Sequence, residues 1–143
     1  YSEEAISVTR EHGDPWSDGV ARCNLAEASF RLGRIDLAAD QVMDAIAVAV
    51  DVSDRLLQAD CLEVLAAVEV ERGAHRSAAR ILGTSEALRE VIGYPLQPAE
   101  RALRQDTLAK IRTEIGESEL TSAWSEGAGS DVEETLAVLI AGR

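Results

Sequence analysis

The chain has 143 residues, enough for one domain with a sizeable core, and 46% of them are hydrophobic although only 3% are aromatic. Its excess of Ala and Leu favours closely packed helices over a sheet. The formal net charge is −12, from 26 acidic residues against 14 Lys and Arg, so this chain is not expected to bind a phosphate backbone and therefore nucleic acid.

The predicted elements begin with residues 1 to 12, which have the pattern of a second helix from an incomplete helical unit. Apolar residues at helical spacing then predict one helix pair at about 16 to 32 and 35 to 52, and another at about 54 to 72 and 75 to 92. The pairs are related by a shift of 40 positions, which matches Leu25 with Leu65, Ala26 with Ala66, Gly33 with Gly73, Ala38 with Ala78, and Val42 with Leu82.

Glycines mark the turns of these units. Gly33 and Gly73 are expected to end the first helix of each pair, because glycine tolerates the positive φ found after a helix C-terminus. The same shift matches Gly13, Ser53 and Gly93 in the turns between units. Each unit is therefore predicted to be a helical hairpin.

Each predicted helix has one apolar side. On the first helices the inward stripe is expected to comprise Ala21, Leu25, Ala28 and Leu32, matching Cys61, Leu65, Val68 and Arg72. On the second helices it comprises Ile35, Ala38, Ala39, Val42, Ala45, Ile46 and Ala49 in the first unit, and Ile81, Leu82, Leu88, Val91 and Ile92 in the second.

The remaining residues break the period. Gly93 and Pro95 predict a helix end near Ile92 and an extended link over 93 to 97. A helix is expected at about 98 to 115, stopped at Gly116, and a short one before Gly127. Ser130 and Glu133 are the expected capping box of a last amphipathic helix. A stacked array needs a terminal unit over its apolar end, and residues 98 to 143 are expected to be that cap.

The repeated small residues and glycines resemble tetratricopeptide repeats. The matching positions are Ala26, Gly33, Ala38 and Ala45 in one unit and Ala66, Gly73, Ala78 and Ser85 in the next. The resemblance implies an all-α fold, a right-handed helical-repeat array of antiparallel helix pairs with a C-terminal helical cap. Residues 1–143 then make a single domain, with a half repeat at 1–12, repeats at 16–52 and 54–92, and capping helices at 98–143.

Motifs for chemistry are missing from the sequence. No phosphate-binding loop or nucleophile elbow occurs, and His12 and His75 are expected at helix ends rather than on a metal ion. Cys23 and Cys61 lack CxxC spacing and are expected to be free core thiols of a cytoplasmic protein. We therefore expect no catalytic residue, cofactor, metal or membrane-spanning segment; a hydrolase or transferase on a helical scaffold is the remaining catalytic alternative.

The tail adds a more specific resemblance. The run from Arg80 to Arg101, RILGTSEALREVIGYPLQPAER, and the later Ala123-Trp124-Ser125-Glu126-Gly127 resemble the C-terminal region of large actinobacterial transcriptional regulators of the LuxR type. In these, a signal-transduction ATPase module precedes tetratricopeptide-like repeats, and some relatives carry an adenylate cyclase or kinase domain instead. The resemblance implies that a longer parent binds ATP and DNA elsewhere, and that this chain is its sensor or interaction arm.

Tetratricopeptide arrays bind partners in a concave groove lined by their first helices. Carrying over the groove positions gives Cys23, Glu27, Phe30, Glu63, Ala67 and Val70, although Cys23 and Phe30 fit a core role equally well. The expected partner is an apolar or basic protein segment, another domain of the parent, or a small effector. Trp124 is expected to plug the end of the array rather than to anchor a partner.

Two non-catalytic functions follow. The first is an interaction or effector-sensing module of an ATP-dependent transcriptional regulator. The alternative is a structural arm that oligomerises the parent, as a homodimer formed through residues 1 to 12. The sequence does not identify the partner, the effector or the DNA site.

Overall fold

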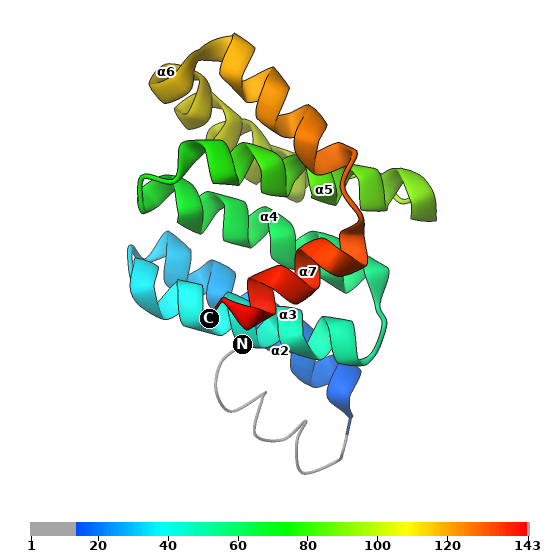
Figure 1. The fold of residues 1–143 in the computed structure, drawn as a ribbon. Helices are drawn as coiled ribbons and strands as arrows, with labels where there is room; N and C mark the ends of the chain where they lie inside the picture. The colour runs from blue at the N-terminus through cyan, green and yellow to red at the C-terminus, as the bar shows by residue number, and fades with distance from the viewer. Residues whose placement is uncertain (1–13, 143) are drawn as a thin grey trace.

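The computed structural model describes residues 14–142, and within this range every regular element is a helix. Figure 1 shows these helices stacked in layers, so the predicted all-α array of antiparallel helix pairs is confirmed. The predictions for residues 1 to 12, including the dimer contact and His12, lie outside the described residues. The helices are α2 (Pro15–Arg31), α3 (Ile35–Asp51), α4 (Arg55–Glu71), α5 (His75–Ile92), α6 (Pro98–Ala128) and α7 (Val132–Ala141).

Two helical hairpins have the same construction. The bounds of α4 lie 40 positions after those of α2, and α5 likewise begins 40 positions after α3. The turn within each hairpin contains a glycine with positive φ, 79° at Gly33 and 85° at Gly73. At the matching end of the second helices, φ is 55° at Ser53 and 67° at Gly93. The predicted repeat therefore extends to the backbone conformation of its turns.

The first helix of each hairpin also begins in the same way. Asp14 and Asp54 are N-caps, whose carboxylates accept hydrogen bonds from the backbone N–H groups of Ser17 at 3.2 Å and Leu57 at 3.0 Å. Such a cap satisfies an amide that has no partner inside the helix. These two aspartates are 40 positions apart, so the repeat includes its helix starts.

Helix α4 is the centre of the core. Its Cys61, Leu65 and Val68 are buried, whereas in α2 Ala28 is exposed and Leu32 is 72% exposed. The predicted inward stripe was therefore wrong at Ala28 and at Leu32, which directly follows α2, and also at Arg72 of the second unit, which is exposed. The reason is that α4 packs against α2, α3, α5 and α6, whereas among the described helices α2 packs mainly against α3 and α4. The second-helix stripe is confirmed from Ala38 to Ala49, and Ile35 is half-buried.

The end of α5 differs from its predicted apolar face. Val91 is 76% exposed, and Arg89 is buried with only 2% of its surface accessible. Arg89 lies where α4, α5 and the start of α6 meet, and its charge is paired there with Asp60 of α4. The ion pair between Arg89 and Asp60, a residue distant in sequence, thus places a charged side chain in the core at the end of α5, where the apolar pattern predicted Val91.

Helix α6 consists of two segments that meet at Gly116, where φ is 83° and ψ is 167°. Figure 1 shows the chain turning back at this point, so the predicted stop at Gly116 is confirmed. The second segment crosses α5 closely. A Cβ atom added to Gly127 would lie 1.8 Å from the carbonyl oxygen of Arg80, and one added to Gly83 would lie 2.1 Å from that of Trp124. At this crossing the two backbones touch.

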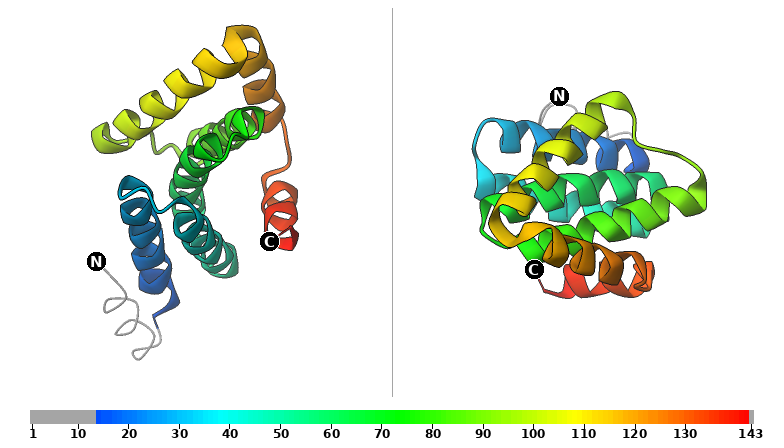
Figure 2. Two further views of the ribbon diagram at one scale, coloured as in Figure 1. Left: turned by 90° about the vertical axis from the view of Figure 1, so that its left-hand side faces the viewer. Right: turned by 90° about the horizontal axis from the view of Figure 1, so that it is seen from above.

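Helix α7 returns along the array and contacts α3. In the left view of Figure 2 it lies on one side of the stack and the first segment of α6 on the other. Its Leu136 is buried, and Glu133 pairs with Arg55 at 3.8 Å. The predicted Ser130 cap was wrong: the N-cap is Asp131, which accepts from the Glu134 amide at 3.1 Å, while the Ser130 hydroxyl donates to the Gly127 carbonyl.

None of the helices described is both long and apolar enough to cross a bilayer.

Candidate functional site

The candidate site is a cavity of about 130 Å³ between α2, α4 and the start of α6. Its apolar wall combines side chains from all three helices, and carboxylates stand among them. The lining residues are Val20, Cys23, Asn24, Glu27, Leu57, Asp60, Glu63, Val64, Ala99, Glu100 and Leu103. We call this space the inter-helix cavity.

Three of the six predicted groove residues line the inter-helix cavity, namely Cys23, Glu27 and Glu63. The other three do not. Ala67 and Val70 are buried in α4, and Phe30 is half-buried against the core. The structure therefore brings together one half of the predicted groove and adds the N-terminal turns of α6, which the repeat pattern did not include.

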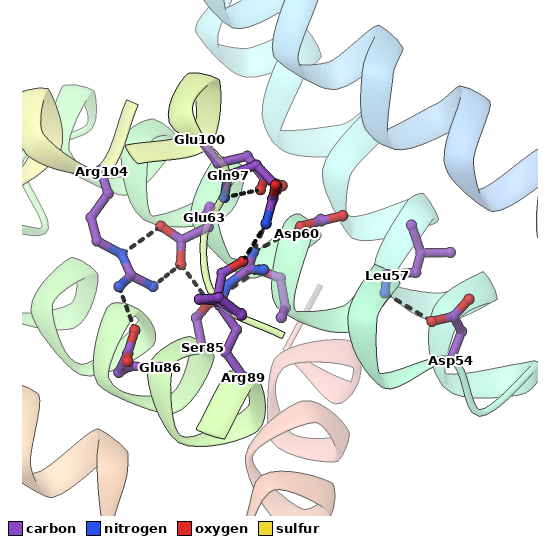
Figure 3. A network of polar contacts seen from close by, with 12 residues as sticks. Asp54, Leu57, Asp60, Glu63, Ser85, Glu86, Arg89, Gln97, Glu100 and Arg104 are labelled. Atoms are coloured by element: carbon purple, nitrogen blue, oxygen red, sulfur yellow. Dashed lines mark hydrogen bonds and ion pairs between the residues drawn. The ribbon is translucent and has the colours of Figure 1, made fainter. Parts of the chain in front are cut away.

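Glu63 is held from two sides although it projects from the middle of α4. Its carboxylate accepts from Nε of Arg104 at 3.0 Å and from Nη2 at 2.5 Å, and the Ser85 hydroxyl also donates to it. Arg104 makes a further 2.5 Å contact with Glu86 (Figure 3). Its guanidinium lies 5.5 Å from the ring centroid of Trp124, which packs against the core as expected. This network joins α4, α5 and both segments of α6.

A second group of charges lies at the same junction (Figure 3). Nη2 of Arg89 donates to Asp60 at 2.7 Å and lies 3.9 Å from Glu100. Glu100 also accepts from the backbone N–H of Gln97 at 2.9 Å, which fixes the start of α6. Nε and Nη1 of Arg89 are buried without a hydrogen-bond partner in the described part of the chain. Arg89 thus makes both of its ion pairs, with Asp60 and with Glu100, through the single nitrogen Nη2.

These surroundings shift the acidity of the carboxyl groups in opposite directions. Burial, followed by the hydrogen bond and negative charge of Glu100, raises the pKa of Asp60 to about 7, although Arg89 opposes the change. Burial raises the pKa of Glu100, but hydrogen bonds with Asp60 and Gln97 and the charge of Arg89 outweigh it, so this pKa is lowered. Below about pH 7 the pair therefore retains one proton, mainly on Asp60.

This proton makes stability depend on pH. Because the pKa of Asp60 is higher in the folded chain, folding retains a proton, and its contribution to stability is lost as the pH rises toward about 7. We expect Asp60→Asn to remove about 1 to 2 kcal/mol of the stability loss between pH 5 and pH 8, after allowing for partial solvent screening. Urea unfolding of both proteins at the two pH values measures this; equal losses would contradict the assignment.

Cys23 and Cys61 are free and buried, as predicted. A hydrogen bond with Cys23, together with complete burial, raises the pKa of Cys61 well above its usual value. A thiol that stays protonated is a poor nucleophile, so Cys61 fits a packing role in the core, while Cys23 lines the cavity.

A larger hollow lies on the other side of α5. It has a volume of about 430 Å³ and is formed by α5, the end of α6 and α7. Three of its hydroxyl groups are engaged internally: that of Thr84 is within hydrogen-bond distance of the carbonyls of Arg80 and Gly127, that of Thr135 donates to Ser130, and that of Ser130 donates to the Gly127 carbonyl. The charges around it, Arg80, Asp131 and Glu134, are exposed. The lining of this hollow thus has one positive and two negative side chains, whereas all charged residues that line the inter-helix cavity are acidic.

Sequence reasoning missed Asp60, Arg89, Glu100 and Arg104. No short motif links them, because they come from three helices that meet only in the folded chain. A charged residue inside an otherwise apolar segment, such as Arg89 after Leu88, was the available signal. Across the described residues, no group of three or more His, Cys, Asp or Glu side chains is arranged to hold a metal ion.

Comparison with known proteins gives one consistent result. Over all 143 residues the chain is 27% identical to regulators of Mycobacterium bovis and of two Mycobacterium tuberculosis strains, which are provisionally named HTH-type transcriptional regulators. The chain spans 16% of the length of these relatives. No protein-family description and no solved structure matches it. Its similarity is thus to transcriptional regulators in general.

Proposed function

We propose that this chain is a non-catalytic interaction module of a transcriptional regulator, and that it binds a protein segment at the inter-helix cavity. The observation that carries the proposal is the cavity itself, which is open to solvent and combines apolar walls with carboxylates from three helices. Recognition sites typically combine a mostly apolar surface with a few placed polar groups. The apolar and acidic side chains that line the cavity are therefore suited to binding a protein segment.

The similarity to transcriptional regulators supports the proposal that this chain is part of such a regulator. We propose that the parent is a cytoplasmic regulator of the LuxR type, in which a signal-transduction ATPase module precedes tetratricopeptide-like repeats and DNA is bound elsewhere in the parent. The helix pairs, their repeated glycine turns and the capping helices support this comparison. A partner bound in the cavity would contact both α4 of the repeats and α6 of the cap, so binding could affect how the cap packs on the repeats.

A substitution at the rim tests the proposed site. Asn24 lines the cavity and is exposed, so Asn24→Arg is expected to block entry and add a positive charge without disturbing the core. Peptides selected on the chain from a random display library are expected to bind this variant at least tenfold more weakly in fluorescence anisotropy.

The matched control is Gln105→Arg, which introduces the same side chain at an exposed position of α6 that does not line the cavity. Its affinity for the selected peptides is expected to be within about twofold of that of the unsubstituted chain. Equal binding by both variants would place the docking site elsewhere, and a library without binders would count against an interaction module.

A further inference from the structure

Around the inter-helix cavity, carboxylate groups outnumber the guanidinium groups that pair with them. Four carboxylates line the cavity, those of Glu27, Asp60, Glu63 and Glu100, and a fifth, Glu86, shares Arg104 with Glu63 without lining it. Three guanidinium groups pair with them, since Arg31 contacts Glu27, Arg89 contacts Asp60 and Glu100, and Arg104 contacts Glu63 and Glu86. The surplus is two negative charges, or one while the carboxyl pair of Asp60 and Glu100 retains a proton.

The lining itself contains no positive charge. All three arginines that pair with its carboxylates lie outside the set of residues that face the cavity. Asp60 and Glu100 remain about one-third exposed, with side-chain exposures of 32% and 31%, so a ligand in the cavity can reach them. Apolar side chains complete the lining, among them Val20, Leu57 and Leu103.

The size of the cavity limits the ligand. Sites for drug-sized molecules usually enclose about 300 to 1,000 Å³. A space of about 130 Å³ is suited to one long side chain of a docking segment. An aliphatic stem in contact with Val20, Leu57 and Leu103, ending in a positive charge at Asp60 and Glu100, would match both the apolar and the acidic residues of the lining.

We propose that the inter-helix cavity binds a lysine side chain of the docking segment, with its ammonium group between Asp60 and Glu100. The inference rests on the proposed function and specifies its ligand. The carboxylates approach from different helices, so they suit the three diverging N–H donors of an ammonium better than a planar guanidinium. The positive ligand takes the place of the proton that the two carboxyl groups share.

Binding should therefore depend on pH. The charged groups that face Asp60 are Arg89 from α5 and Glu100 from α6, while Glu63 of the same helix and Glu27 of α2 line the same cavity. An alkylammonium stays charged below about pH 10. With a pKa of Asp60 of about 7, the carboxyl is about one-tenth ionised at pH 6 and about nine-tenths at pH 8, so affinity should rise about tenfold.

The test uses the isotope-labelled chain and n-pentylammonium, followed by NMR. We expect shifts centred on the cavity residues Val20, Val64 and Leu103, with binding about tenfold tighter at pH 8 than at pH 6. The uncharged 1-pentanol and n-butylguanidinium are each expected to bind at least fivefold more weakly. Equal affinity for pentanol, tighter binding of the guanidinium, or affinity unchanged by pH would overturn the proposal.

Two variants complete the test. Asp60→Asn is expected to lose the pH dependence and most of the affinity for n-pentylammonium, and Glu27→Gln, at the rim, to weaken it about threefold while leaving the Asp60 and Glu100 pair intact. Glu69→Gln is the control, because Glu69 is on the same helix outside the cavity and pairs with no charged side chain within residues 14–142. If selected peptides bind at the cavity but n-pentylammonium does not, the lysine inference fails and the proposed function stands.

Discussion

Gly127→Ala is expected to destabilise the chain by about 3 kcal/mol or more, or to prevent the cap from docking. The added Cβ would lie 1.8 Å from the carbonyl oxygen and 2.7 Å from the carbonyl carbon of Arg80. These are backbone atoms of α5, so no side-chain rotation can make room. The helices must separate, which also disturbs the hydrogen bond between the Thr84 hydroxyl and the Gly127 carbonyl.

Urea unfolding followed by circular dichroism measures this effect, and Gly129→Ala is the matched control. Gly129 is two positions away, has a φ of −89°, and an added Cβ would be 3.4 Å from the nearest atom, the carbonyl oxygen of Ser125. Its substitution is expected to change stability by less than about 1 kcal/mol. Similar midpoints for the two variants would show that α5 and α6 are not in backbone contact.

The second large effect is expected at Glu63. Its side chain is 3% exposed and that of Arg104 is 11% exposed, so Glu63→Gln leaves a largely buried guanidinium whose remaining carboxylate partner is Glu86. Removing one member of a buried ion pair typically costs about 3 to 5 kcal/mol. Because Glu86 remains, we expect a loss of about 3 kcal/mol in the free energy of unfolding.

A double-mutant cycle separates this pair from simple loss of packing. In Glu63→Gln combined with Arg104→Gln, the unpaired charge is gone, so the loss should be at least about 1 kcal/mol smaller than the sum of the single variants. Glu69→Gln again serves as the control on α4, with an expected change within about 0.5 kcal/mol. Additive single effects would mean that the contact contributes nothing to stability.

The helix positions could be predicted because they depend on local patterns. Gly33 and Gly73 set the turns, Pro98 starts α6, and Gly116 breaks it, each through its own backbone preference. The last helix start was misplaced by one residue, since Ser130 and Asp131 are both good caps and only the folded backbone distinguishes them. Local sequence patterns thus predict which segments form helices, but not the exact residue at which the last helix begins.

The site could be predicted only in part. Cys23, Glu27 and Glu63 were expected from the resemblance to tetratricopeptide repeats, whose groove positions they match, and they do line the cavity. Arg89 and Glu100 could not be placed in this way, since they contribute through the junction between α4, α5 and α6. The close crossing at Gly83 and Gly127 likewise depends on two helices whose glycines meet only after folding.

Hydrogen–deuterium exchange with a selected peptide tests the central claim most directly, because it reports where the partner docks. Binding at the inter-helix cavity predicts slower exchange in the turns that line it, at 20–27 of α2, 57–64 of α4 and 99–103 of α6. Exchange in α7 should stay unchanged. Slower exchange confined to α7 and α5, with these three stretches unaffected, would contradict the account.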